Sequence, residues 1–287
     1  MNLCKFTNEL PKVQVLRDGE FEVLGFVISK IEKKTLTFLE SADYIDQLKE
    51  NVSCVICTKE VSESIPEKYG VCISESPRRD FFLIHNYLTK NNLYGKAEFK
   101  TQIGENVQIS NRAIISEKNV IIGDNVVIEE NVIIRDDVEI GDNSIIRANT
   151  VLGGEGFQYI QGNEIIYVEH AGGLKIGNNV EVKYNNCIDK ALFSWDNTMI
   201  KNYVKVGCLN VLGHACKIGE RTLIAGGAAI SGATIIGHDC WIGPNATVSH
   251  MIEIGDNTRV GIGSVVMKSI ESDKVVVGNP ARSMWNK

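Results

Sequence analysis

The sequence has little of what exported or membrane-bound chains carry. Its opening stretch, MNLCKFTNELPKVQV, has no long apolar core. No later stretch reaches the roughly 18 apolar residues that a membrane-spanning helix needs. We therefore expect a cytoplasmic protein without a membrane partner.

An excess of positive charge is also missing. The 287 residues include 30 Lys and Arg against 36 Asp and Glu, which gives a formal net charge of −6 at pH 7. Such a chain has no overall field that would attract nucleic acid or an anionic membrane. Any phosphate that the protein binds must be held by local groups.

The cysteines do not follow the pattern of a disulfide framework or a zinc site. Cys54 and Cys57 form a CxxC motif, but VSCVICTKE is typical of a buried strand and no second CxxC accompanies it. The others are scattered along the chain: Cys4, Cys72, Cys187, Cys208, Cys216 and Cys240. The histidines likewise show no close pair of the HxxxxH kind, so we expect reduced cysteines and no catalytic metal.

A six-residue repeat fills the chain from about residue 103 onward. An aliphatic residue recurs every six positions and is usually followed by Gly, Asp or Asn. The first run contains Ile103, Ile109 and Ile115 and, after a slip of one residue, Ile122, Ile128, Ile134, Ile140, Ile146 and Leu152. The second run has no slip: Ile200, Val206, Leu212, Ile218, Ile224, Ile230, Ile236, Ile242, Val248, Ile254, Val260 and Val266.

This period predicts a solenoid. Six residues fit neither an α-helix nor an alternating open sheet, but three hexads can close a triangular coil whose inward corners are the aliphatic residues. The pattern resembles the left-handed parallel β-helix of hexapeptide acyltransferases, which we expect over residues 96–287. Residues eighteen apart then lie above one another, roughly 4.8 Å apart along the axis.

Two loops interrupt the repeat, at 153–173 and 189–198, and a short tail ends the chain. The first contains Phe157 and Tyr159, and the second contains Phe193 and Trp195. Loops that leave a regular scaffold often carry function. These aromatic side chains are expected either to contact substrate or to pack on a neighbouring subunit.

Residues 1–95 lack the repeat and predict a separate small α/β domain. GEFEVLGFVIS, TLTFLE, VSCVICTK and YGVCISE are typical of short strands, and RRDFFLIHNYLTKN is typical of a helix with one apolar side.

One column of the predicted β-helix has useful chemistry. His214, Gly232 and His250 are spaced by eighteen residues and occupy the same hexad position. Acyl transfer from a thioester needs a base for the incoming amine and a donor for the tetrahedral oxyanion. His214 can be the base and the Gly232 N–H the donor. The alternative is a surface histidine beside a small repeat residue.

Several motifs give the chain a resemblance to the UDP-3-O-(3-hydroxyacyl)glucosamine N-acyltransferases. LTFLESADYIDQL and SESPRRDFF look like the nucleotide-binding domain of that family, and GGEGFQYI, HAGGLKIGNNVEV and NNCID match its β-helix in order. HACKIG followed by IAGGAAISG is also similar to bacterial amino-sugar N-acetyltransferases, whose base is the histidine of that motif. Both resemblances imply that His214 is the base.

The resemblance also assigns the nucleotide site. It implies that Phe38 and Tyr44 sandwich the base of the nucleotide, with packing in the domain core as the alternative. Ser41 stands where the family usually has an asparagine that reads uracil, so the acceptor can be UDP- or dTDP-linked. Gly207 replaces the family's acidic residue seven positions before the catalytic histidine, and the family's second histidine falls one position after His250, so we expect a different acceptor.

The C-terminal segment points to the acyl donor. VVVGNPARSMWNK stands where the lipid A enzymes continue into a helix that docks acyl carrier protein. GNPAR instead resembles the end of coenzyme A-dependent hexapeptide acetyltransferases. This implies that Gly278, Asn279 and Pro280 line coenzyme A and that Arg282 pairs with its phosphate, with His250 along the donor channel. A turn that merely ends the solenoid is the alternative.

Together these features predict a homotrimeric N-acyltransferase that moves an acyl group from acyl-CoA to the amino group of a dTDP- or UDP-linked amino sugar. An enzyme of deoxyamino-sugar biosynthesis, such as the N-acyltransferase of the anthrose pathway, would combine these features. One alternative is the acyl-carrier-protein-dependent lipid A enzyme. Another is a non-catalytic β-helix scaffold, which would not need the His214 and Gly232 column.

Overall fold

The computed structural model describes residues 1–5 and 13–286 and divides into two compact units. The N-terminal unit comprises Met1–Lys96 and Gln158–Glu169, and the solenoid unit comprises Ala97–Phe157 and His170–Lys287. Most of the first predicted loop thus belongs with the N-terminal residues. Within the described residues, no helix is both long and apolar enough to cross a membrane.

The N-terminal unit is built on a mixed sheet in the order β1-β5-β4-β3-β2. Its strands are β1 (Gln14–Arg17), β2 (Val23–Leu24), β3 (Thr35–Leu39), β4 (Val52–Cys57) and β5 (Gly70–Ile73). β1 is antiparallel to β5, and the other pairs are parallel. β3, β4 and β5 confirm the strands expected from TLTFLE, VSCVICTK and YGVCISE, whereas GEFEVLGFVIS forms a strand only at Val23–Leu24 and β1 was not expected. Cys54 and Cys57 lie buried in β4.

Helix α2 (Pro77–Lys90) packs on β3 and β4. It begins with Pro at its first turn, where the missing N–H costs no hydrogen bond. Phe81, Ile84 and Leu88, spaced by three and four residues, are buried on its sheet-facing side. The shorter helices are α1 (Lys59–Ser62), η1 (Leu3–Lys5) and η2 (Ala42–Gln47).

A hairpin of β15 (Tyr159–Ile160) and β16 (Ile166–Tyr167) is attached to α2. The Asn86 amide donates to Tyr167 O at 2.8 Å and accepts from the Glu169 N–H at 2.9 Å. His85 Nε2 lies 2.9 Å from Glu169 O, and because a carbonyl only accepts, this nitrogen carries the proton. These bonds to backbone groups place residues 158–169 in the N-terminal unit.

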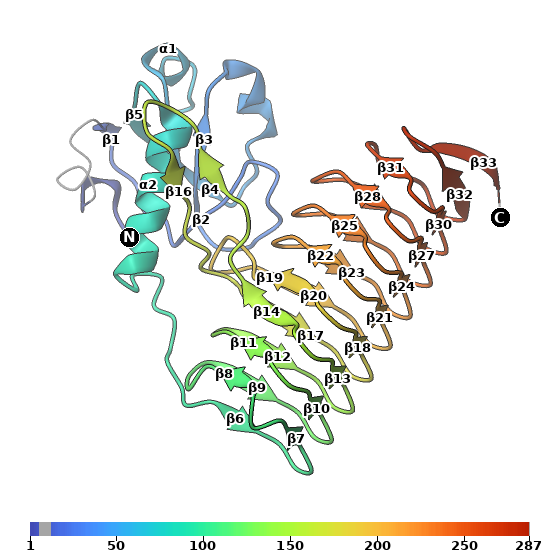
Figure 1. Cartoon of the computed structure of the whole chain (residues 1–287). Coiled ribbons are helices and arrows are strands. Elements are labelled where there is room, and N and C mark those ends of the chain that lie inside the picture. The colour runs from blue at the N-terminus through green and yellow to red at the C-terminus, as the bar shows by residue number, and fades with distance from the viewer. Residues whose placement is uncertain (6–12, 287) are drawn as a thin grey trace. The chain divides into compact units, whose positions relative to one another are not determined.

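The solenoid unit is a left-handed β-helix with three parallel sheets, whose coils stack along one axis in Figure 1. The first sheet contains β7 (Gln108–Ile109), β10 (Val127–Ile128), β13 (Ile145–Ile146), β18 (Glu181–Val182), β21 (Lys205–Val206), β24 (Leu223–Ile224), β27 (Trp241–Ile242), β30 (Arg259–Val260), β32 (Lys274–Val277) and, antiparallel, β33 (Arg282–Asn286). The second contains β8 (Ile114–Ile115), β11 (Ile133–Ile134), β14 (Val151–Gly154), β19 (Cys187–Asp189), β22 (Val211–Leu212), β25 (Ala229–Ile230), β28 (Thr247–Val248) and β31 (Val265–Val266). The third contains β6 (Gln102–Ile103), β9 (Val120–Ile122), β12 (Val138–Ile140), β17 (Gly173–Ile176), β20 (Asn197–Ile200), β23 (Lys217–Ile218), β26 (Ile235–Ile236) and β29 (Glu253–Ile254).

The register of the strands follows the hexads. In the second run, Ile218 pairs with Ile236 and Ile236 with Ile254, so residues eighteen apart lie above one another as predicted. All the aliphatic residues predicted to point inward in that run are at most 2% exposed. The prediction is wrong for Ile103 and Ile109, which are 52% and 37% exposed. They lie in the terminal coil, where an end of the stacked core lacks a covering neighbour.

Candidate active site

The structure places His214, Gly232 and His250 in one column on the solenoid. They follow β22, β25 and β28, which are neighbours in the second sheet. The Ala233 N–H donates to His214 O at 2.7 Å, and the Met251 N–H donates to Gly232 O at 3.1 Å. The backbone therefore links the three positions coil by coil.

The His214 ring lies directly against Gly232. A Cβ added at Gly232 would come within 2.6 Å of His214 Nε2, closer than real Cβ contacts. Only glycine leaves room for the ring in this position. Among the described residues, the Gly232 N–H finds no acceptor, so it remains available to a ligand.

The two ring nitrogens of His214 differ. Nδ1 is buried and has no hydrogen-bond partner in the described part of the chain. Nε2 is not among these buried, unpartnered atoms and keeps some access to solvent. Burial lowers the pKa of His214, and the negative charge of Asp196 offsets part of that effect. Since the ordinary value is near 6.5, the ring is neutral at pH 7 and can accept a proton.

The second loop fixes the turn beside His214. Asp196 accepts hydrogen bonds from Lys217 Nζ and from the Asn197 N–H. The Thr198 hydroxyl oxygen accepts from the Ala215 N–H at 2.8 Å. Because Ala215 adopts a left-handed conformation with φ of 60°, this bond stabilises a turn that an alanine does not favour by itself.

Three side chains, that of His214 among them, converge on Gly156. A Cβ there would lie 2.9 Å from His170 Nε2, 3.0 Å from His214 Cδ2 and 3.3 Å from Asp189 Oδ2. The His170 ring meets the His214 ring edge-on, with centroids 5.5 Å apart. The Gly156 N–H donates to His170 Nε2 at 3.2 Å. A larger residue at position 156 would displace this cluster.

Asp189 brings a buried carboxyl group to the same cluster. Burial raises its pKa, and the Cys187 thiol donates to Oδ1 at 3.7 Å. Burial also raises the pKa of Cys187 to about 11, so the sulfur keeps its proton.

Sequence reasoning did not single out His170, Asp189, Asp196 or Lys217. The first two lie in motifs that carried the family resemblance, and this was the only signal that could have found them.

The residues assigned to the nucleotide lie in the N-terminal unit. The Phe38 ring, in β3, packs at 5.1 Å from the Phe81 ring, and Tyr44 in η2 is half exposed. Ser41 caps η2 by accepting from the Asp43 N–H. In the described part of the chain, no ring contact joins Phe38 to Tyr44. Tyr159 lies in the hairpin of the same unit.

The residues assigned to the donor lie at the end of the solenoid. Gly278 has a φ of 97°, which favours glycine, and Asn279–Pro280 is a cis peptide bond. Backbone bonds from the Val265 N–H to Gly278 O and from the Ala281 N–H to Val265 O fix this turn on the last coil. Arg282 is exposed at the start of β33. His250, which was assigned to the donor channel, is also exposed. Phe157, which was assigned to the substrate, is 91% exposed.

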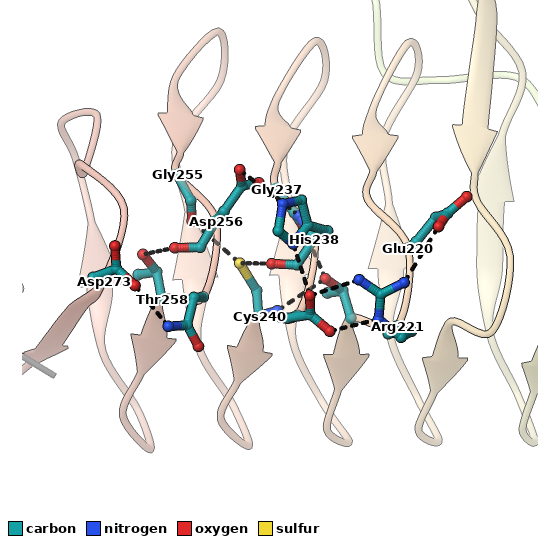
Figure 2. A network of polar contacts seen from close by, with 12 residues as sticks. Glu220, Arg221, Gly237, His238, Cys240, Gly255, Asp256, Thr258 and Asp273 are labelled. Carbon is teal, nitrogen blue, oxygen red and sulfur yellow. Dashed lines mark hydrogen bonds and ion pairs between the residues drawn. The ribbon is translucent and has the colours of Figure 1, made fainter.

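Another histidine, His238, has a different environment (Figure 2). Its Nδ1 lies 2.7 Å from Asp239 and its Nε2 lies 3.0 Å from Asp256, one coil further on. Arg221, one coil before, makes two bonds of 2.7 Å to Asp239. These exposed ion pairs connect three successive coils. Both His238 nitrogens are thus engaged, unlike those of His214.

Comparison with known proteins agrees with the repeat. Residues 119–154 and 233–268 match the profile "Bacterial transferase hexapeptide (six repeats)", and residues 100–136 match "Hexapeptide repeat of succinyl-transferase". The UDP-N-acetylglucosamine acyltransferase of Campylobacter jejuni has the same β-helix fold, with a TM-score of 0.59 at 21% identity over 65% of this chain and 70% of that chain. Fold and repeat thus define a hexapeptide-repeat protein.

Sequence relatives narrow the family. The UDP-3-O-acylglucosamine N-acyltransferase of Helicobacter pylori strain HPAG1 is 34% identical over 225 residues, which span 70% of this chain and 66% of the relative. The protein of the same name from Wolinella succinogenes is 29% identical over 135 residues, 46% of this chain and 42% of the relative. The chain belongs to the hexapeptide-repeat family of UDP-3-O-acylglucosamine N-acyltransferases, which confirms the resemblance. It spans about two thirds of the length of the first relative.

Proposed function

We propose that this protein is an N-acyltransferase that moves an acyl group from acyl-CoA to the amino group of a dTDP- or UDP-linked amino sugar. The observation that carries the proposal is the neutral, partly buried His214 ring lying against Gly232 in the β-helix of this family. The curated relatives act, by their names, on a UDP-linked acylglucosamine. A nucleotide-linked amino sugar is therefore the acceptor class that we assign.

The proposed reaction uses both groups of the column. The neutral amine attacks the thioester carbonyl carbon to form the C–N bond, and His214 Nε2 accepts the proton that the amine loses. The Gly232 N–H donates to the tetrahedral oxyanion. When the oxyanion collapses, the C–S bond breaks and the imidazolium returns its proton to the leaving thiolate. The products are an amide and a free thiol.

The negative charge of Asp196 supports this mechanism. Its negative charge acts on His214, and it favours the imidazolium that forms while the oxyanion exists. The family's acidic residue is absent at Gly207, where an added Cβ would come within 2.7 Å of Gly226 N. A carboxylate from the second loop thus takes over part of the electrostatic role.

The donor and acceptor are assigned to separate parts of the chain. We assign coenzyme A to the solenoid end, with Gly278, Asn279 and Pro280 lining it and Arg282 pairing with a phosphate. His250, two coils from His214, contacts the pantetheine arm. The nucleotide base stacks on Phe38 and Tyr44, beside Ser41, and Phe157 and Tyr159 contact the sugar. The active assembly is a homotrimer.

Mass spectrometry of products tests this proposal. Purified protein is offered a panel of acyl-CoAs and acyl carrier proteins together with UDP- and dTDP-linked amino sugars. We expect an amide product with acyl-CoA. Turnover with acyl carrier protein alone would instead support the lipid A reaction that the relatives' names suggest. No turnover with either donor, from protein with a native melting transition, would support a non-catalytic scaffold.

A further inference from the structure

We propose that His170 is a positioning residue for His214 and that the Gly156 N–H keeps it in the neutral state which this role requires. The inference rests on the proposed function, because it assigns His214 as the base. It concerns how the orientation of the base is fixed.

His214 lacks the hydrogen bond that usually orients a catalytic histidine. Its Nδ1 is buried without a partner among the described residues, although such bases are commonly held through this nitrogen by a carboxylate or a carbonyl. The rotation of an imidazole about its second side-chain torsion is otherwise broad. Packing must therefore hold the ring.

Gly232 and His170 supply that packing. Gly232 allows the close approach at Nε2, and His170 meets the ring edge-on at an interplanar angle of 71°. His170 is only 4% exposed, so its own ring has little freedom. The absence of a side chain at Gly156 lets both rings and Asp189 approach the same point.

The bond from Gly156 decides which form His170 takes. Because an N–H donates to His170 Nε2, this nitrogen carries a lone pair and the ring proton lies on Nδ1. A doubly protonated His170 would turn an N–H toward the Gly156 N–H. His170 therefore stays neutral while His214 takes up a proton, and no second positive charge develops 5.5 Å from the imidazolium. Among the described residues, the ionisable groups that contact or act on the two rings include Asp189 and Asp196; the Cys187 thiol donates to Asp189, and Lys217 pairs with Asp196.

The test compares His170→Ala with His238→Ala, a histidine on the same solenoid outside the cluster. For His170→Ala we expect kcat to fall about 10- to 100-fold, the loss that misplacing a catalytic group by about 1 Å can cause. The KM for each substrate should stay within about twofold. Water that enters the vacated space should also raise the pKa of His214, so that the acid limb of kcat/KM moves to higher pH. His238→Ala should leave kcat, KM and the pH profile unchanged.

A second measurement does not depend on turnover. In protein with ¹⁵N-labelled histidine, NMR should show His170 protonated at Nδ1 alone, and the His214 titration should move to higher pH in His170→Ala. His170→Gln, whose amide oxygen can still accept from Gly156, guards against misfolding and should shift the His214 titration less than His170→Ala. An unchanged kcat and an unchanged His214 titration in folded His170→Ala would overturn the inference, as would protonation of His170 at Nε2. If wild-type protein transfers no acyl group while the titration shifts as expected, the proposed function fails and the positioning role stands.

Discussion

At the scale of single residues, the chemistry of the site depends on which groups touch each side of the His214 ring. Gly232 leaves room at Nε2, and burial of the ring keeps it neutral at pH 7. The spacing of eighteen residues was enough to predict that His214, Gly232 and His250 form one column. It could not show that His170 reaches the same ring, because His170 follows a loop of irregular length that has no place in the repeat.

Replacing the base gives the most direct test of the mechanism. His214→Asn should lower kcat by about 10²- to 10⁴-fold, since a general base contributes on that order. Nucleotide-sugar binding, measured by calorimetry, should stay the same, because the stacking residues assigned to it lie in the N-terminal unit. Wild-type turnover in the variant would remove His214 from the mechanism.

The contact at Gly232 predicts a similar effect from a smaller change. Gly232→Ala places a methyl group within 2.6 Å of His214 Nε2, so the ring must move. We expect kcat to fall by about 100-fold with the melting temperature nearly unchanged, because position 232 is at a solenoid turn. Gly263→Ala is the contrast. Its added Cβ meets no atom within 4 Å, so it strains the backbone at a φ of 62° without any clash with a side chain. Equal activity of Gly232→Ala and wild type would contradict the geometry.

At the scale of elements, the hairpin shows how side chains can replace sheet pairing. Asn86 satisfies two backbone groups of residues 166–169, and His85 satisfies a third. The sequence predicted α2 from its apolar spacing. It gave no sign that the polar residues of this helix would hold a distant loop, because such bonds join residues more than 80 positions apart.

Asn86→Ala should therefore loosen the hairpin. Two hydrogen bonds to partly buried backbone groups are lost, and leaving such groups unpaired costs about 1 to 3 kcal/mol of stability. Hydrogen exchange should accelerate at Glu169, whose N–H loses its acceptor. Asn91→Ala, on the exposed C-terminal end of the same helix, serves as the control and should leave exchange at Glu169 unaltered.

His85 predicts how this unit responds to acid. Burial lowers the pKa of His85 to about 4, from an ordinary value near 6.5 in the unfolded chain. Between these values the unfolded chain binds a proton that the folded one does not, so stability falls as pH decreases from about 6.5 to about 4. The expected slope from this group is up to about 1.4 kcal/mol per pH unit. Urea unfolding across this range should show a shallower pH dependence in His85→Gln, and an equal slope would exclude His85 as the cause.

At the scale of the whole molecule, the solenoid exposes apolar side chains that a monomer has no need to present. Leu223 and Trp241 are neighbours on the first sheet and are 38% and 41% exposed, and Ile235 on the third sheet is 44% exposed. These side chains alternate with the buried aliphatic residues of each strand. The adjacent pair Leu223 and Trp241 supports the proposed homotrimer, because contiguous exposed apolar surface commonly marks an interface.

Light scattering after size exclusion tests that assembly. We expect a mass of about three times the 31.7 kDa of one chain. Trp241→Glu should shift the mass toward one chain, because a charge placed in an apolar interface has no partner there. His238→Ala, at an exposed position in the turn before β27, is the control. A mass of one chain for the wild type at micromolar concentration would contradict the trimer.

The sequence by itself determined the β-helix, its register and the His214 column, because a hexad repeat fixes which side chains point inward and which residues stack. It also determined α2 and the strands β3 to β5 of the N-terminal unit, whose apolar spacing is local. Only the tertiary structure decided the surroundings of the base: Gly156 and His170 lie in the first loop, and Asp189 lies at the end of β19. Their convergence depends on loop paths and on close contacts of a few ångströms, and neither is encoded in a period.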